Sequence, residues 1–245
     1  MDTYRILYQK ITADDLAVLR AVDAAILEPR FVTHAMAAEL RAARTLTFGY
    51  LSVMETPAWN VERCERLRAD DYWEEDGLRM HFPAWDSYLM DLRSPHYRAL
   101  LLEEAERHVL QKNMDGLFLD TVGDLTEYIP AGHVRDEMQA AYRDLLDEIV
   151  RRAPGLKLLQ NRGFDTLPCV GAKLYGLLWE DWRGDLVRDE WVRLRLDMIE
   201  RWQRSGMQVL TVSADSRSVH AKTARARGFV HLTCGQGYHT LQGQA

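Results

Sequence analysis

Eight short apolar runs, each ending in polar residues, recur in order along the whole chain. Between most of them lie stretches with helical apolar spacing. One follows Thr12, with Asp15 three positions on, the pattern of an N-cap and capping box. Apolar strands alternating with helices are typical of parallel α/β sheets, and eight such units favour a barrel over an open sheet. The predicted strands are Arg5–Gln9, Ala24–Glu28, Leu46–Ser52, Gly116–Asp120, Leu156–Asn161, Tyr175–Glu180, Gln208–Ser213 and Gly228–Leu232.

The length of the chain fits this interpretation. Its 245 residues, of which 47% are hydrophobic, suit one eight-stranded barrel with a large core. No Pro-, Gly- or Ser-rich linker divides the chain, and no repeat is visible beyond the strand–helix unit. The sequence therefore predicts a single-domain (β/α)8 TIM barrel over residues 1–245.

Two connections depart from the ideal unit. The stretch from Met54 to about Arg93 is long and rich in charge and aromatic residues, so we expect an insertion between the third strand and its helix, lying over the barrel mouth. Its aromatic residues include Trp59, Trp73, Trp85 and Tyr88, and we expect Trp59, Trp73 or Trp85 to wall one side of a cleft. The link Phe164–Lys173 leaves room for a short helix at best.

Composition narrows the partners. With 37 acidic and 31 basic residues the formal charge is −6, which argues against nucleic acid and favours neutral or cationic ligands. Cys64, Cys169 and Cys234 lie far apart, which suggests neither a disulfide framework nor a zinc site. No apolar run reaches the roughly 20 residues of a membrane span, and Met1–Arg5 does not read as a leader. As it stands the sequence predicts a cytoplasmic protein; a leader removed from a longer chain would make it secreted.

Carboxylates and amides dominate the residues that follow the predicted strands. In such barrels the reactive groups sit where strands end and helical connections begin, so we expect these side chains to ring one mouth. An isolated acid such as Asp124 is most often a solvated charge. The strand-end residues are Gln9, Glu28, Glu55, Asp120, Gln160, Asn161, Glu180, Asp181 and Asp215.

Asp120 and Glu180 stand out because each directly terminates an apolar run. A bland alternative is that each forms an ion pair with an arginine. Two carboxylates facing each other across a mouth suit glycoside hydrolysis, in which one attacks or activates water and the other protonates the leaving oxygen. We expect Trp179 and Trp182, which flank Glu180, to raise its pKa. Aromatic rings also stack on sugars, and we expect at least two such platforms among Tyr50, Trp59, Trp85, Tyr128, Trp179 and Trp182.

Competing chemistry has weaker signals. Eight scattered histidines show neither HxH nor HExxH spacing, and Ser52 and Ser213 lack a nucleophile elbow. The pair Gly235 and Gly237 is read as a flexible turn rather than a phosphate loop. An all-carboxylate Mg²⁺ site from Glu28, Glu55 and Asp120 stays open as an alternative, although no cofactor or metal is predicted.

Several strand-end segments resemble glycoside hydrolase family 114, the endo-α-1,4-polygalactosaminidase-like barrels. They fall in the family's order across nearly the full chain, and DGxFLD, QN and a downstream Glu are moderately specific as a set. The segments are Tyr8-Gln9, Gly49–Glu55, Asp115–Asp120, Leu159–Asn161, Leu178–Glu180 and Arg227–Phe229.

The resemblance implies a retaining endo-glycosidase acting on galactosamine-containing polysaccharide. Asp120 matches the family's strand-four Asp and Glu180 its strand-six Glu, with nucleophile and acid/base as their natural roles. A substrate with free amines would be cationic, which suits the acidic rim inferred from the residues alone. Candidate substrate-binding residues are Tyr8, Gln9, Glu28, Tyr50, Glu55, Gln160, Asn161, Trp179, Asp181, Trp182 and Asp215.

The sequence also departs from the family pattern. Met54 stands where a glycine is expected before Glu55, and the acid after Asp120 comes one position late, at Asp124. These differences concern the sugar subsites more than the chemistry. Two other functions stay open: a barrel that binds an amino sugar or oligosaccharide without cleaving it, and a metal-dependent hydrolase or lyase that uses the same acids.

Overall fold

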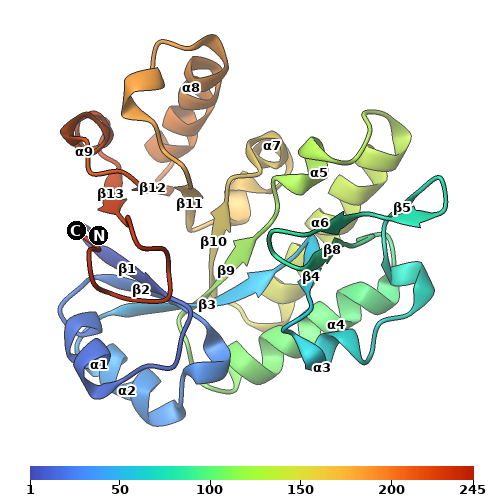
Figure 1. The fold of residues 1–245 in the computed structure, drawn as a ribbon, viewed down its shortest axis with the longest axis horizontal. Coiled ribbons are helices and arrows are strands. Elements are labelled where there is room, and N and C mark those ends of the chain that lie inside the picture. Colours follow the sequence, from blue (N-terminus) through green and yellow to red (C-terminus); the bar gives the residue numbers. More distant parts are fainter.

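The predicted strands form one sheet of eight parallel strands in chain order, in a computed structural model that describes residues 1–245. Figure 1 shows these strands with helices placed outside them. Each predicted run matches an observed strand within two residues, so the (β/α)8 barrel is confirmed. The strands are β1 (Tyr4–Leu7), β2 (Ala24–Leu27), β3 (Leu46–Ser52), β9 (Gly116–Asp120), β10 (Lys157–Asn161), β11 (Gly176–Trp179), β12 (Gln208–Ser213) and β13 (Val230–Thr233).

The helices follow the capping rules that the sequence suggested. Thr12 accepts from the Asp15 backbone N–H, and the Asp15 carboxylate accepts in return from the Thr12 backbone N–H, which fixes the start of the first helix. None of the helices combines the length and apolarity that crossing a membrane requires. The helices around the barrel are α1 (Ala13–Leu19), α2 (His34–Ala42), α4 (Pro95–Ala105), α5 (Asp124–Glu127), α6 (His133–Arg152), α7 (Leu167–Val170), α8 (Glu190–Arg204) and α9 (Ser218–Ala226).

Short helical turns complete the connections. The link from Phe164 to Lys173 consists of three consecutive short turns, in agreement with the prediction of a short helix at best. A π-helical turn, η3, continues α4 toward β9. The turns are η1 (Pro29–Phe31), η2 (Ala69–Asp71), η3 (Glu106–Leu110), η4 (Phe164–Thr166), η5 (Gly171–Lys173) and η6 (Gly184–Leu186).

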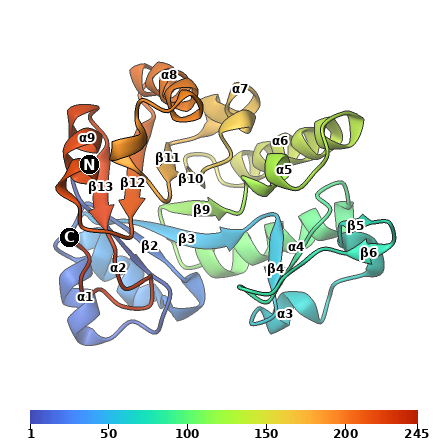
Figure 2. The same ribbon diagram turned by 45° about the horizontal axis from the view of Figure 1, so that its top comes forward.

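The insertion between β3 and α4 is a small antiparallel subdomain. Its three-stranded sheet has the order β4-β8-β7, and β5 pairs with β6 as a hairpin. In Figure 2 it stands on the right, away from α1, α8 and α9. Its elements are β4 (Glu55–Pro57), α3 (Val61–Cys64), η2, β5 (Glu74–Glu75), β6 (Leu78–Arg79), β7 (His81–Phe82) and β8 (Ser87–Leu89).

Arg63 clamps this insertion to the barrel. Its guanidinium is almost fully buried, donates to the Ser52 carbonyl at 2.9 Å and the Glu55 carbonyl at 3.2 Å, and pairs with Glu104 at 2.8 Å. Tyr97 adds its hydroxyl, which lies 3.2 Å from the guanidinium and donates to the Val53 carbonyl. The buried charge is therefore satisfied by bonds that join the end of β3, the insertion and α4.

Strand alternation divides the apolar residues into two cores. An inner cluster of 13 buried residues draws on all eight strands, and a larger cluster of 46 lies between the sheet and the surrounding helices. Successive residues of a strand point to opposite faces, so one set fills the barrel and the next contacts the helices. The inner cluster is Tyr4, Ile6, Ala24, Ile26, Phe48, Phe118, Leu159, Leu178, Leu210, Val212, Val230, Leu232 and Cys234.

Candidate active site

The inner face of three neighbouring strands ends in polar side chains. Asp120, Asn161 and Glu180 come from β9, β10 and the end of β11. Each stands two residues beyond a member of the inner core, so all three point to the barrel axis above that core. Those core residues are Phe118, Leu159 and Leu178.

The Asn161 amide joins the two carboxyl groups. Its Nδ2 atom lies 2.8 Å from Asp120 Oδ1 and 2.7 Å from Glu180 Oε2. Because one nitrogen donates to both, these two oxygens are separated by no more than the sum of the two bonds. Asp120 and Glu180 thus lie across the same small space, and no arginine pairs with either.

Burial and charge act on Glu180 together. Desolvation raises the pKa of its carboxyl group, and the nearby Asp120 raises it further. Hydrogen bonds from Tyr238 and Asn161 oppose this rise, since both stabilise the ionised form. The balance leaves Glu180 more readily protonated than an ordinary glutamate, which suits a proton donor.

A tyrosine cluster of Tyr8, Tyr50 and Tyr238 lies beside the carboxyl groups. The ring centroid of Tyr8 lies 4.9 Å from that of Tyr50 and 5.5 Å from that of Tyr238. Burial and the charge of Asp120 raise the pKa of Tyr8 and Tyr50 well above the usual value, so both hydroxyls keep their protons. The cluster gives the mouth an aromatic surface with hydroxyl groups.

A second pair of acids, Glu55 and Asp124, lies near enough to Asp120 to feel its charge. Burial, then Glu55, raises the pKa of Asp124 to about 9. Burial also raises the pKa of Glu55, which accepts a hydrogen bond from Ser87. The buried Asp124 Oδ2 atom has no hydrogen-bond partner, which agrees with a protonated Asp124 carboxyl group beside Glu55.

Left-handed residues follow all three central side chains. The φ angles are 62° at Thr121, 50° at Arg162 and 55° at Asp181. This conformation is unusual for any residue except glycine and is a genuine outlier for the β-branched Thr121. The Thr121 hydroxyl offsets the strain, because it accepts from the Met54 N–H at 2.8 Å and donates to the Asp120 carbonyl at 2.7 Å. These bonds fix the turn that follows β9 and so the backbone that carries the Asp120 carboxyl group.

Three predicted residues face the helices instead of the mouth. Gln160 is fully buried, accepts from the Tyr142 hydroxyl at 2.8 Å and donates to backbone carbonyls after β10. Trp179 belongs to the outer core. Trp182 is also fully buried there and donates its indole N–H to the His220 carbonyl. Because neighbours on a strand point in opposite directions, Asn161 and Glu180 occupy the inner face while Gln160 and Trp179 occupy the outer one.

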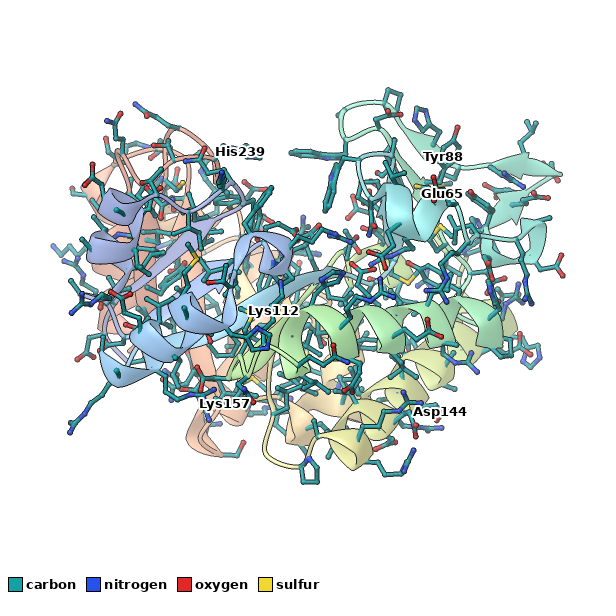
Figure 3. The ribbon with its side chains drawn as sticks, turned by 90° about the horizontal axis from the view of Figure 1, so that it is seen from below. Glu65, Tyr88, Lys112, Asp144, Lys157 and His239 are labelled. Atoms are coloured by element: carbon teal, nitrogen blue, oxygen red, sulfur yellow. The ribbon has the colours of Figure 1, made fainter.

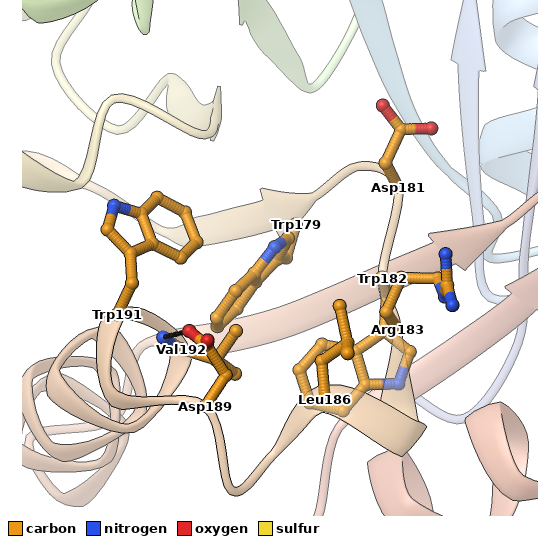
Figure 4. Close-up of a pocket in the computed structure, with 8 residues that line it drawn as sticks. All are labelled: Trp179, Asp181, Trp182, Arg183, Leu186, Asp189, Trp191 and Val192. Carbon is orange, nitrogen blue, oxygen red and sulfur yellow. Dashed lines mark hydrogen bonds between the residues drawn. The ribbon is translucent and has the colours of Figure 1, made fainter.

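A cavity of about 280 Å³ lies on this outer side, between the end of β11 and α8. Figure 4 shows Trp179, Trp182 and Trp191 around it, with Asp181 and Asp189 among its other lining residues. The cavity is separate from the inner face that carries Asp120, Asn161 and Glu180. The expected apolar surroundings of Glu180 therefore come from the inner tyrosines Tyr4, Tyr8 and Tyr238 rather than from Trp179 and Trp182.

The remaining strand-end acids have protein partners. Glu28 is buried and accepts from the Arg30 backbone and guanidinium, both at 3.1 Å. Asp215 accepts from the Arg217 guanidinium and lies 2.8 Å from the buried His220. Gln9 is partly exposed just beyond β1. No group of three or more His, Cys, Asp or Glu side chains is arranged to hold a metal ion.

The insertion tryptophans differ in exposure. Trp73 is buried in the outer core and lies under the Arg93 guanidinium. Trp59 and Trp85 are 54% and 74% exposed. Trp59 also lies 5.2 Å from the guanidinium of Arg30, which belongs to η1 just after β2, so this ring reaches the rim of the mouth. Figure 3 shows the insertion, marked by Tyr88, across from His239, with Lys157 of β10 at the opposite edge.

Sequence reasoning missed Tyr238 and discounted Asp124. The Tyr238 hydroxyl donates to Glu180 Oε1 at 2.6 Å, from a segment interpreted as a flexible turn. The aromatic residue directly after Gly237, close behind the last strand, was the available signal. For Asp124 the signal was the late acid after Asp120, which the structure brings to Glu55.

Fold and site together define a class of protein: a (β/α)8 barrel with paired carboxyl groups at its strand ends. The glycoside hydrolase domain of PelA from Pseudomonas aeruginosa has this fold, with a TM-score of 0.81 over 99% of this chain and 97% of that one, at 24% identity. Ega3 of Aspergillus fumigatus, solved with galactosamine, aligns with a TM-score of 0.69 over 95% and 90%, at 12% identity. The α-galactosidase TtGalA from Thermus thermophilus aligns at 0.61 over 96% of this chain and 58% of that one, at 13% identity.

At these identities the likeness concerns the fold. The alignments show that this chain shares the barrel fold of the PelA glycoside hydrolase domain and of Ega3 over nearly its full length. No family model matches the sequence, and no curated protein matches it either.

Proposed function

We propose that this protein is a retaining glycoside hydrolase that cleaves galactosamine-containing polysaccharide. The observation that carries the proposal is the single Asn161 amide that bonds to both Asp120 and Glu180. The two bonded oxygens are separated by no more than the sum of these two bonds, an upper limit that is compatible with the about 5–5.5 Å between the carboxyl groups of retaining enzymes and shorter than the about 6.5–9.5 Å of inverting ones. The fold shared with the PelA domain and Ega3 supports the same class.

The proposed reaction has two steps. Asp120 attacks the anomeric carbon as the glycosidic bond breaks, and Glu180 gives its proton to the departing oxygen. Glu180 then takes a proton from water, whose oxygen attacks the anomeric carbon and releases Asp120. The raised pKa of Glu180 supports its role as the acid, because the group has to be protonated when the first step begins.

The Glu55–Asp124 pair supports a cationic amino sugar as substrate. Burial and mutual repulsion favour the protonated form of this pair near Asp120, and a bound ammonium group would supply positive charge and hydrogen-bond donors in place of a proton. A neutral acetamide supplies no such charge. We therefore expect the enzyme to prefer free galactosamine units over N-acetylated ones.

The test is reducing-end release from partially de-N-acetylated galactosaminoglycan, with the fully N-acetylated polymer and chitosan compared at equal concentration. We expect Asp120→Asn to lower turnover by at least about 10³-fold and Glu180→Gln by about 10²- to 10⁴-fold, less with an activated leaving group. Asp144→Asn, on the exposed face of α6, is the matched control and should retain wild-type activity.

Azide distinguishes retention from inversion. Added to Glu180→Ala with an activated galactosaminide, it should restore part of the turnover and give a glycosyl azide of retained configuration. Hydrolysis within a few-fold of wild type in both Asp120→Asn and Glu180→Gln would exclude these groups from the chemistry. Tight binding of the polymer without any release by the wild type would favour a binding barrel.

A further inference from the structure

The residues after β13 turn back and fill the gap beside β1. No ladder joins β13 to β1, and Gln244 bridges the two edges instead. Its side chain accepts from the Ile6 N–H at 3.1 Å and donates to the Ile6 carbonyl at 2.6 Å. Ala245 pairs with Thr233 through two backbone bonds of 2.8 and 3.0 Å. Residues 234–245, the closing segment, are thus bound to both edges of the barrel.

The closing segment carries Tyr238 to the mouth. The Tyr8 N–H donates to the Tyr238 carbonyl at 2.7 Å, which continues the contact two residues beyond Ile6, just past the end of β1. The Tyr238 ring packs against Tyr8, and the Cys234 thiol donates to the carbonyl of Gly237 at 3.0 Å. Gly237 has a φ of 72°, a conformation that glycine adopts without strain. Main-chain, thiol and ring contacts therefore fix the position of this tyrosine.

The Tyr238 hydroxyl bonds to the oxygen of Glu180 that Asn161 leaves free. Tyr238 lies 2.6 Å from Oε1, and Asn161 lies 2.7 Å from Oε2. Burial and the charge of Glu180 raise the pKa of Tyr238 far above the usual range, so the phenol stays protonated and acts as a donor. Two donors on two elements hold the plane of the carboxyl group.

We propose that Tyr238 is a positioning residue that orients the Glu180 carboxyl group through its hydroxyl, and that the closing segment is therefore part of the active site. The inference rests on the proposed function, in which Glu180 is the acid and base. A carboxyl group with two fixed oxygens presents its proton in one direction, whereas a group held at one oxygen rotates about its χ3 torsion.

The hydroxyl also affects protonation. It stabilises the ionised form of Glu180, so its removal should raise the pKa of Glu180. The ionisable groups that act on Glu180 include Asp120 of β9 and Asp181 in the turn after β11. Tyr4 of β1, Tyr8 just beyond β1 and the Cys234 thiol face it as well. None of these changes in a Tyr238→Phe variant, which keeps the ring that packs on Tyr8.

The experiment compares Tyr238→Phe with a matched control, Tyr175→Phe. Tyr175 precedes β11 at the opposite end of the barrel, where its ring packs on Phe48. The first readout needs no substrate: the Glu180 carboxyl carbon is titrated by NMR in ¹³C-glutamate-labelled protein and assigned with Glu180→Gln. The second is the pH profile of kcat/KM on the de-N-acetylated polymer.

In Tyr238→Phe we expect the Glu180 pKa to rise by about one unit and kcat/KM to fall about tenfold, mostly through kcat, as the loss of one hydrogen bond to a charged group predicts. Tyr175→Phe should change neither. An unchanged Glu180 titration in Tyr238→Phe would overturn the inference, whatever the activity. A shifted titration in a protein that cleaves no amino-sugar polymer would instead contradict the proposed function and leave the contact between Tyr238 and Glu180 established.

Discussion

Asn161→Leu should change the electrostatic interactions of the two carboxyl groups while it largely preserves the shape of the site. Leucine is close to asparagine in size and removes the amide that bonds to Asp120 and Glu180 at 2.8 and 2.7 Å. Two ionised carboxylates about 5 Å apart, at an effective dielectric constant of about 20, repel each other by about 3 kcal/mol. In the native protein Asn161 offsets this repulsion, since it donates to both groups.

The size of the effect follows from the bonds that are lost. A hydrogen bond to a charged group contributes about 1.5–3 kcal/mol, and 1.36 kcal/mol corresponds to one pKa unit or a tenfold rate change. The Glu180 pKa should therefore rise by about 1–2 units, because the bond from Asn161 favours its ionised form. The alkaline limb of the kcat/KM profile should move upward by the same amount, and the maximum should fall about 10- to 150-fold.

Gln160→Leu is the matched control, an amide one residue earlier on the same strand. Its bonds go to Tyr142 and to the backbone after β10, so its loss should cost at least about 2 kcal/mol of unfolding free energy and leave the pH profile in place. The assays are pH-dependent hydrolysis of the de-N-acetylated polymer and urea unfolding. If Asn161→Leu lowers stability but leaves the alkaline limb where it was, Asn161 does not couple the two carboxyl groups and our reasoning is wrong.

Two further predictions concern stability. Arg63→Met should lower the free energy of unfolding by about 3–5 kcal/mol, because it leaves Glu104 with only Arg30 as a cation. The control Arg66→Met removes the exposed ion pair with Glu103 and should cost about 1 kcal/mol or less. Equal losses of the two variants in denaturant unfolding would contradict the role of Arg63 as a clamp. The raised pKa of Asp124, about 9, means that the folded state binds a proton which the unfolded state has released, so stability should fall as pH rises from about 4 to 9, by up to about 1.4 kcal/mol per unit. Asp124→Asn should flatten this dependence in urea unfolding between pH 5.5 and 8.5, and an unchanged slope would show that Asp124 does not hold the proton.

The fold was accessible from the sequence because its signals are local. Each buried parallel strand is a continuous apolar run, and β3, β9 and β12 match the predicted bounds to the residue. The insertion was equally visible as a long charged and aromatic stretch between β3 and α4. Asp120, Asn161 and Glu180 were found for the same reason, since each closes one of these runs.

Strand parity was the information that the site prediction lacked. The sequence prediction placed Gln160 beside Asn161 and Trp179 beside Glu180 in the mouth, although adjacent residues of a strand face opposite sides of the sheet. Leu159 and Leu178 belong to the inner core, so the residues two positions on, Asn161 and Glu180, also face the barrel interior. The same alternation, applied to the apolar runs of the sequence, would have separated the residues that face the mouth from those that face the helices.

Other parts of the site depend on contacts between distant residues. Tyr238 and Glu180 are 58 positions apart, and their contact relies on Gln244 reaching Ile6 across 238 positions. Likewise Asp124 reads as a solvated acid until β4 of the insertion brings Glu55 beside it. No pattern within a single strand or helix encodes such contacts.

The buried Arg63 has a consequence for how a long substrate would reach the mouth. Its buried bonds tie the first turns of the insertion to the end of β3 and to α4, which restrains the backbone where the insertion leaves β3. Lids that close over a substrate need a few residues free to change their backbone angles. We therefore expect a polymer to bind along the preformed surface of the insertion rather than to be enclosed by it, and turnover to be insensitive to solvent viscosity.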